Sequence, residues 1–369
     1  MSVSKDNKNS DIQVLRAIAI ILVLIQHYKW RMPSPDWYVG IFDYVNFWGG
    51  VDIFLAISGF LMYGIISKEI SRSGRTLTTF FSFISKRFFR LYPALIIWSI
   101  LSVFAAWYIT PDFDTDIGKT IYNIIPTLLS YSNFYWFNCA SSAISCGSSD
   151  LSGITWSLSL EWQLYISLSI IMLLTRGKAF IMVLISIFIL SLLIGYGHGG
   201  FKSIAWWTRP HAFILGAILC AANSRFNINI NKNLRVALLF ISIVLICIVP
   251  NYAPENTVVL LVGLLGAACL LACINGDLFR DSFLRSMLTW IGDRSYSIYL
   301  GHFIVMHVIA KSIRTYSEIK FINENAFFAL IVYVFALLVT SHLSFKYIEM
   351  PFIEIGKSTI KKIVKCKAA

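Results

Sequence analysis

Long apolar runs separated by short polar segments occupy nearly the whole chain. A membrane-spanning helix needs about 20 mostly apolar residues, and ten runs meet this requirement. The pattern predicts an all-α, polytopic integral membrane protein. Its ten transmembrane helices are expected at these approximate positions: 12–30, 47–67, 89–109, 155–174, 179–196, 204–222, 234–250, 257–274, 294–312 and 326–346.

A further apolar stretch, 121–137, is short, rich in aromatic residues and interrupted by Pro126. We interpret it as an interfacial or re-entrant segment. If it crossed the membrane, the number of spans would be eleven, and every residue after it would lie on the opposite side.

The basic residues test this arrangement, because cytoplasmic loops of membrane proteins carry an excess of lysine and arginine. With a cytoplasmic N-terminus, ten spans put 23 of the 31 lysines and arginines inside and the remaining 8 outside. We therefore expect both termini in the cytoplasm, a transmembrane domain over 1–350 and a basic tail over 351–369. The polar start, MSVSKDNKNSD, predicts that no cleavable signal peptide precedes the first span.

The composition agrees with a chain that has lipid as its main solvent. Hydrophobic residues make up 57% and charged residues only 14%, with a mean hydropathy of +0.71, whereas soluble domains contain about 25% charged residues. The net charge of +12 would fit nucleic acid, but the side preference of the basic residues explains it. We expect contact with anionic membrane lipids and no nucleic-acid partner.

The largest expected outer loop, about 110–154, is polar and contains Cys139 and Cys146. Disulfides form outside the cytoplasm, so a disulfide between these two cysteines is possible. The other cysteines lie at lipid level or in the cytoplasm and act as small apolar residues. The sequence shows no zinc-ligand spacing, and we expect no bound metal.

Two ionisable residues share one face of the first span. Arg16 and His27 are eleven residues apart, which places them within about 20° of the same face and about 16 Å apart along the helix. Charged groups inside spans are costly and mark functional sites. Arg16 could instead reach lipid headgroups, whereas an imidazole at the depth of His27 needs a partner and suits proton transfer.

Two carboxylates lie at a depth similar to that of His27. Asp52 is in the second span and Glu161 is in the fourth, both in the outer half. The sequence therefore predicts one polar cluster of these three residues, open to the outside or to a cavity.

Three more polar residues lie within later spans. Arg209 and His211 are near the outer end of the sixth span, and His302 is near the middle of the ninth. Asp52 and Arg209 could form a buried structural ion pair. His211 is more simply interpreted as a satisfied interfacial residue than as a catalyst.

A compact basic group precedes the third span. Lys86, Arg87 and Arg90 could anchor the topology or hold the phosphates of a cytoplasmic ligand, since arginine suits bidentate contacts with phosphate.

Seven segments, in order along most of the chain, together resemble one family of membrane enzymes. They are LRAIAIILVLIQH (15–27), GGVDIFLAISGFLM (49–62), RFFRLYP (87–93), TWSLSLEWQLY (155–165), RPHAFILGAIL (209–219), SYSIYLGH (295–302) and YIEMPF (347–352). In this combination the chain resembles acyltransferase family 3, the integral-membrane O-acyltransferases that modify surface polysaccharides.

The chain also departs from the family pattern. Trp162 follows Glu161 where the family often has a second glutamate, and Ile304 stands where members often have proline. Many members carry an extra span and a C-terminal hydrolase-like domain, which we expect this chain to lack.

The resemblance implies a route for an acyl group across the membrane. The donor would be a cytoplasmic acyl-CoA, most simply acetyl-CoA, whose phosphates meet Arg87, Arg90 and Arg16. The acceptor would be a hydroxyl of a lipid-linked or polymeric glycan such as O-antigen, outside the bacterial inner membrane. No tightly bound cofactor is implied, and a separate extracytoplasmic protein could complete the transfer.

Within this route, His27 would be the general base or a transient acyl carrier, with Glu161 or Asp52 orienting it. The two roles of His27 stay open on the sequence alone. Further candidates for the site are His302, Arg209 and Ser58.

A proton-coupled transporter is the main alternative, because it would also keep ionisable residues within its spans. The sequence shows no inverted repeat of the kind common in transporters. A scaffold protein would have no reason to keep so many charges at depth.

Overall fold

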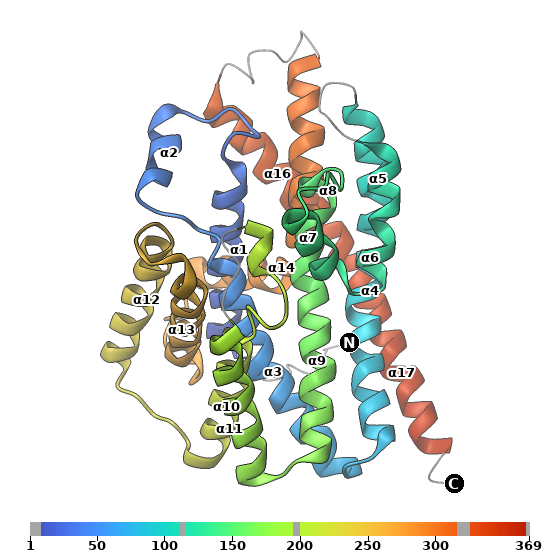
Figure 1. The fold of residues 1–369 in the computed structure, drawn as a ribbon, viewed down its shortest axis with the longest axis vertical. Helices are drawn as coiled ribbons and strands as arrows, with labels where there is room; N and C mark the ends of the chain where they lie inside the picture. The colour runs from blue at the N-terminus through green and yellow to red at the C-terminus, as the bar shows by residue number, and fades with distance from the viewer. Residues whose placement is uncertain (1–8, 111–115, 195–199, 316–324, 367–369) are drawn as a thin grey trace.

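The computed structural model describes residues 9–110, 116–194, 200–315 and 325–366, and within them all regular secondary structure is helical (Figure 1). The main helices are α1 (Ser10–Tyr28), α3 (Gly50–Ser73), α4 (Leu77–Ile109), α9 (Trp156–Leu174), α10 (Gly177–Ile194), α11 (His211–Phe226), α12 (Lys232–Tyr252), α13 (Glu255–Cys273), α14 (Phe283–Thr315), α16 (Ala326–Ser344) and α17 (Met350–Cys366).

Short helices fill the connections. They are α2 (Asp36–Gly40), α5 (Ile117–Tyr122), α6 (Ile124–Leu128), α7 (Ser132–Ser141) and α8 (Ser149–Ser152), with 3₁₀ turns at Ile41–Asp43, Gly153–Thr155 and Gly200–Ser203. The stretch 121–137 therefore contains no helix long enough to cross a membrane, which excludes an eleventh span there.

Eight helical segments of the described chain are long and apolar enough to span a membrane. They match eight of the ten expected positions, and the other two positions hold the shorter apolar helices Gly177–Leu193 and His211–Phe226. The structure thus confirms a polytopic helical membrane protein. The number of ten spans and the cytoplasmic location of both termini stay predictions.

Three of the expected helix starts are wrong. The ninth span was expected from residue 294, but α14 begins at Phe283. The sixth span was expected from residue 204, but α11 begins at His211, with Pro210 at its N-cap, where the missing backbone N–H of a proline is tolerated. The third was expected from residue 89, but α4 begins at Leu77 and is 33 residues long. Arg87 and Arg90 therefore lie on a helix rather than in a loop.

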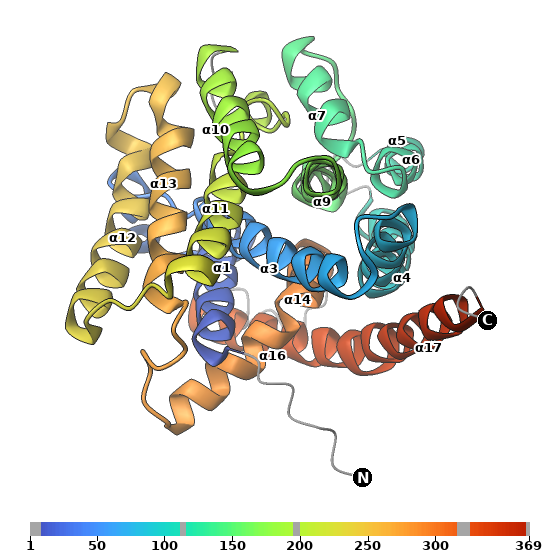
Figure 2. The ribbon, with the colours of Figure 1, turned by 90° about the horizontal axis from the view of Figure 1, so that it is seen from below.

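The helices form a bundle with two distinct ends. In Figure 1, α2 and α8 lie toward the upper end, and the α3–α4 turn and the end of α17 lie toward the lower end. Figure 2 shows α17 beside α4 at one edge, with α12 and α13 at the opposite edge. The lower end is the side on which the basic residues predict the cytoplasm.

The outer surface of the bundle is apolar. Large side chains such as Phe104, Trp107, Phe240 and Phe335 are between 63% and 70% exposed. A water-soluble protein rarely exposes so many large apolar residues, so this surface suits the hydrocarbon interior of a membrane.

Two pairs of helices approach closely at glycines. A Cβ atom on Gly59 of α3 would lie 2.0 Å from the Phe213 carbonyl oxygen of α11, and one on Gly216 would lie 2.0 Å from the Ala56 carbonyl oxygen. Gly292 of α14 approaches the backbone of Gln13 on α1 equally closely. Small residues allow such contacts between membrane helices, and these contacts set α1, α3, α11 and α14 side by side around the polar residues.

Candidate functional site

The polar face of α1 lies against α14, as the spacing of Arg16 and His27 predicted. Arg16 donates through Nε and Nη2 to the Ser295 hydroxyl, at 3.2 and 3.0 Å. About three turns further along α1, the Nδ1 atom of His27 lies 3.0 Å from Nε2 of His302. Both partners belong to α14, so the two predicted residues do share one side of α1.

Three arginines converge on a small cavity in the middle of the bundle. This middle cavity has a volume of about 90 Å³, and Arg16, Arg87 and Arg90 line it. Within the described residues none of the three forms an ion pair. Since buried charges need partners, the arrangement of these guanidinium groups is chemically suited to an anion.

Glu161 belongs to the middle cavity and not to the surroundings of His27. Its Oε1 accepts hydrogen bonds from the hydroxyls of Ser58 and Tyr165. Ser58, a further candidate from the sequence, is therefore a partner of Glu161. The carboxylate also contributes negative charge to a cavity that is otherwise dominated by arginine.

The middle cavity adjoins a larger one at the lower end of the bundle. This inner cavity, of about 590 Å³, is also lined by Arg16, Arg87 and Arg90. Lys86 reaches it as well, but its Nζ lies 2.5 Å from the Glu69 carboxylate. Of the predicted basic group, only the two arginines are therefore free of a carboxylate partner in the described part of the chain.

Sequence reasoning missed a buried carboxylate at the inner cavity. Glu349 is 4% exposed, lines this cavity and accepts a hydrogen bond from the Ser297 hydroxyl. The signal was present, because Glu349 stands in the apolar segment YIEMPF, where a charge is expensive.

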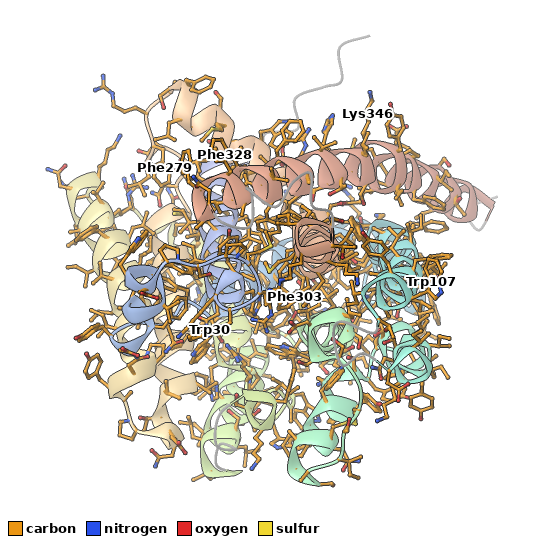
Figure 3. The ribbon with its side chains drawn as sticks, turned by 90° about the horizontal axis from the view of Figure 1, so that it is seen from above. Trp30, Trp107, Phe279, Phe303, Phe328 and Lys346 are labelled. Carbon is orange, nitrogen blue, oxygen red and sulfur yellow. A yellow bond between two sulfur atoms is a disulfide. The ribbon has the colours of Figure 1, made fainter. Side chains whose placement is uncertain are left out.

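His27 lines a third cavity, on the upper side. This outer cavity has a volume of about 520 Å³, and Arg31, Asp150 and Phe303 also line it. Figure 3 shows Phe303 near the centre of the bundle, whereas Trp107 lies at its edge. The Phe303 ring packs against both His27 and His302, with centroids 4.6 and 4.4 Å away.

A charged network beside His27 was not foreseen. The Asp150 carboxylate accepts two hydrogen bonds from Arg31, at 2.5 and 2.6 Å, and lies 2.8 Å from Nε2 of His307. Arg31 and Asp150 were assigned to outer loops, where charges are ordinary, so the sequence carried no signal for their pairing. The only signal was His307, which lies within the expected ninth span. The network ties the segment after α1 to α8 and α14.

A thin partition separates the middle and outer cavities. Val51 and Tyr299 line both of them. The Tyr299 hydroxyl lies 2.7 Å from the Ser157 hydroxyl and donates to the Ile154 carbonyl oxygen at 2.9 Å. The three cavities therefore follow one another along α1, and the middle one is the smallest.

The structure does not join Asp52, Glu161 and His27 into one cluster, which corrects the expectation from their depth. Asp52 forms a buried ion pair with Arg209, whose Nε lies 3.0 Å from Oδ1, and their side chains are 1% and 6% exposed. The guanidinium of Arg209 also lies over the rings of Trp48 and Trp156, 4.8 and 5.1 Å from their centroids. This geometry supports the structural interpretation of Asp52, although Arg209 also borders the outer cavity.

We expect Asp52→Asn to destabilise the fold, because it leaves Arg209 buried without its counter-ion. Breaking a buried ion pair by removing one partner costs about 3–5 kcal/mol. The measurement is the thermal unfolding of the purified protein in detergent, where the midpoint should fall by several degrees. Asp43→Asn, at an exposed carboxylate, is the matched control, and an equal midpoint for both variants would contradict a stabilising pair.

His211 is not part of these cavities. Its Nε2 lies 2.9 Å from the Ser191 hydroxyl, and its ring packs edge-on against Phe188. This agrees with its interpretation as a satisfied polar residue. In the described part of the chain, no group of three or more histidine, cysteine or acidic residues is placed to hold a metal ion.

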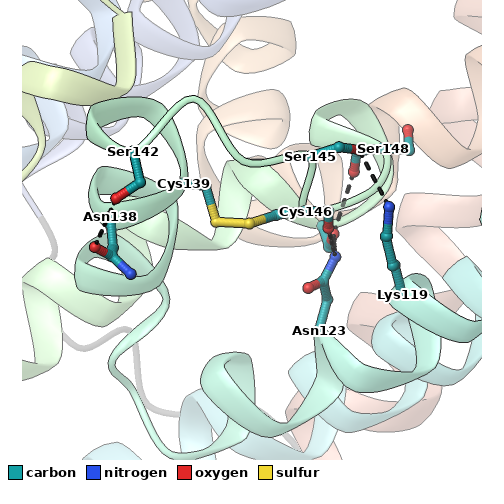
Figure 4. Close-up of a disulfide and its surroundings, with 9 residues drawn as sticks. Lys119, Asn123, Asn138, Cys139, Ser142, Ser145, Cys146 and Ser148 are labelled. Atoms are coloured by element: carbon teal, nitrogen blue, oxygen red, sulfur yellow. Dashed lines mark hydrogen bonds between the residues drawn. A yellow bond between two sulfur atoms is a disulfide. The ribbon is translucent and has the colours of Figure 1, made fainter.

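The predicted disulfide between Cys139 and Cys146 is present (Figure 4). It joins the end of α7 to the segment that leads into α8. Nearby, Asn123 donates to the Cys146 carbonyl oxygen at 3.0 Å, and Lys119 donates to the Ser145 hydroxyl at 3.2 Å. These contacts fix the short helices that surround the upper end of α9.

Comparison with known proteins gives a consistent result. A family model described as an acyltransferase domain matches residues 9–344. An O-acetyl transferase of Shigella phage Sf6 is 30% identical over 247 residues, which cover 63% of this chain and 68% of the phage protein. No solved structure matches.

Two longer bacterial relatives match almost the whole chain. A Bacillus subtilis (strain 168) protein provisionally named a peptidoglycan O-acetyltransferase is 26% identical, over 91% of this chain and 54% of its own length. A Staphylococcus aureus (strain COL) protein provisionally named an O-acetyltransferase is 27% identical, over 93% of this chain and 57% of its own. The chain thus spans little more than half the length of these two relatives.

Proposed function

The chain belongs to this family of membrane acyltransferases, and we propose that it moves an acetyl group from cytoplasmic acetyl-CoA to a hydroxyl of a surface glycan such as O-antigen. Its place would be the bacterial inner membrane, with the lower end of the bundle in the cytoplasm. The relatives named as O-acetyltransferases support the class of reaction.

The observation that carries this proposal is the set of three arginines without carboxylate partners in the described chain. Arg16, Arg87 and Arg90 line both the inner and the middle cavity. Phosphate oxygens are strong partners for guanidinium groups, and coenzyme A carries phosphates at the end remote from its thiol. The phosphates would sit in the inner cavity while the acyl end points toward the middle one.

The small volume of the middle cavity favours a small acyl group. At about 90 Å³ it is several times smaller than the inner cavity of about 590 Å³ and the outer cavity of about 520 Å³. An acetyl group suits this passage better than a long acyl chain. The thioester would then meet the sugar hydroxyl near Tyr299, where the middle and outer cavities adjoin.

On the outer side, His27 would serve as the general base. The hydroxyl proton passes to the imidazole, and the hydroxyl oxygen forms a bond to the thioester carbon. The carbon–sulfur bond breaks with its electron pair on sulfur, which takes up the proton. The products are the acetylated glycan and free coenzyme A, and His27 returns to its starting form.

Membrane vesicles of both orientations provide the test. Inside-out vesicles that contain the protein should transfer labelled acetyl from added acetyl-CoA to the glycan on the luminal side, whereas sealed right-side-out vesicles should not. Movement of a glycan precursor across the membrane without any consumption of acetyl-CoA would instead indicate a transporter. Equal activity in both orientations would contradict the proposed sidedness.

A further inference from the structure

His302 contacts the ring of His27 at its Nδ1 atom and holds the orientation of that ring. The rings are nearly parallel, with an interplanar angle of 16° and centroids 5.1 Å apart. Nδ1 of His27 lies 3.0 Å from Nε2 of His302. The second nitrogen of His302, Nδ1, lies 2.6 Å from the Tyr299 carbonyl oxygen. His302 is fully buried, so these two contacts occupy both of its nitrogens.

These contacts determine where the protons lie. A carbonyl oxygen only accepts hydrogen bonds, so Nδ1 of His302 must carry a proton. A neutral imidazole has one donor and one acceptor nitrogen, which makes Nε2 of His302 the acceptor. The proton between the two rings therefore belongs to Nδ1 of His27, and the lone pair of His27 is left on Nε2.

The neutral form of His302 follows from its surroundings. A buried charge needs a partner, and no carboxylate contacts His302 within the described residues. The nearby Asp150 carboxylate is engaged by Arg31 and by His307.

The other polar groups around His27 leave its Nε2 open. Of the atoms of His27, Arg31 hydrogen-bonds only to the backbone oxygen, at 3.2 Å, and the Tyr38 hydroxyl donates to the Ile25 carbonyl oxygen. In the described chain no hydrogen bond joins the Nε2 atom of His27 to the protein, and the residue lines the outer cavity. This nitrogen is available to a ligand in that cavity.

We propose that His302 is a positioning residue that holds the proton of His27 on Nδ1 and thereby makes Nε2 the atom that accepts the sugar hydroxyl proton. This inference rests on the proposed acetyl transfer. Catalytic imidazoles are commonly oriented by a carboxylate or carbonyl on the other ring nitrogen. Here the Tyr299 carbonyl orients His302, and His302 orients His27, so neither Asp52 nor Glu161 is needed for this task.

The direct test measures the tautomer of His27 by nitrogen NMR. The protein is labelled with ¹⁵N-histidine and placed in lipid nanodiscs without substrate, and His27→Asn assigns the signal. The expected spectrum shows His27 protonated on Nδ1 and unprotonated on Nε2. A signal with the proton on Nε2, or a doubly protonated ring at neutral pH, would overturn the proposal.

Two variants of His302 test the consequence for catalysis. His302→Leu removes the acceptor, so kcat should fall about 10²-fold while the KM for acetyl-CoA stays unchanged. His302→Gln keeps an oxygen that can accept from Nδ1 of His27 and should retain most of the activity. Wild-type kcat in His302→Leu, or an equal loss in both variants, would contradict a positioning role.

The two kinds of measurement separate this inference from the proposed function. The NMR measurement of the tautomer needs neither acetyl-CoA nor the glycan. It therefore tests the contact between His27 and His302 even if the wild-type protein transfers no acetyl group. An inactive wild type with the expected tautomer would refute acetyl transfer and leave the proton assignment in place. An active wild type with the opposite tautomer would refute only the role of His302.

Discussion

Replacing His27 by alanine should lower glycan acetylation by at least about 10²-fold, because general base catalysis contributes about 10²–10⁴ to a rate. The neighbouring imidazole is not placed to take over this task, since His302 is fully buried and lies behind His27, and it does not line the outer cavity. The fold should persist, because the His27 ring is only half-buried and lines a cavity. The measurement is acetyl transfer at an equal amount of protein in the membrane.

His342→Ala is the control for this experiment. His342 accepts a hydrogen bond from Arg294 at 3.0 Å and packs near Trp290, away from the three cavities. It should keep nearly full acetylation. Full activity of His27→Ala would refute the base, and an acetyl group isolated on wild-type His27 in a single turnover would show a carrier instead.

The helical period explains which parts of the site could be read from the sequence. Arg16 and His27 share a face because eleven residues are almost three full turns, and Arg87 and Arg90 are neighbours because they are three residues apart on α4. Both relations lie within a single helix. The structure therefore confirms both of them, because the geometry of one helix does not depend on how it packs against the others.

Relations between helices could not be read in the same way. Depth placed Asp52, Glu161 and His27 at one level, but depth does not fix the rotation of a helix about its axis. The close approach at Gly59 and Gly216 sets α3 against α11, and Asp52 pairs with Arg209, just before α11, instead of facing His27. The contact of His27 with His302 could not be predicted either, because it depends on how α1 and α14 are rotated toward each other. The two residues are 275 positions apart along the chain.

Replacing both Arg87 and Arg90 by alanine should raise the KM or Kd for acetyl-CoA about 10²-fold or more and leave the fold intact. Hydrogen bonds to charged groups contribute about 1.5–3 kcal/mol each, and the double change removes two phosphate partners. Lys86→Ala is the matched control, since Lys86 is on the same helix with the same charge but is paired with Glu69. Binding of acetyl-CoA by the purified protein gives the comparison.

The stability of the same double variant distinguishes a donor site from a structural cluster. Arg16, Arg87 and Arg90 are like charges in one cavity, and none has an ion-pair partner within the described residues, so removing two of them relieves repulsion. The thermal midpoint of the variant should stay equal to that of the wild type or rise, in contrast to the fall expected for Asp52→Asn. A loss of stability with unchanged acetyl-CoA binding would show that the arginines serve the fold. Weaker binding without a loss of stability would show that the protein keeps uncompensated charge in its centre for a ligand that brings the opposite charge.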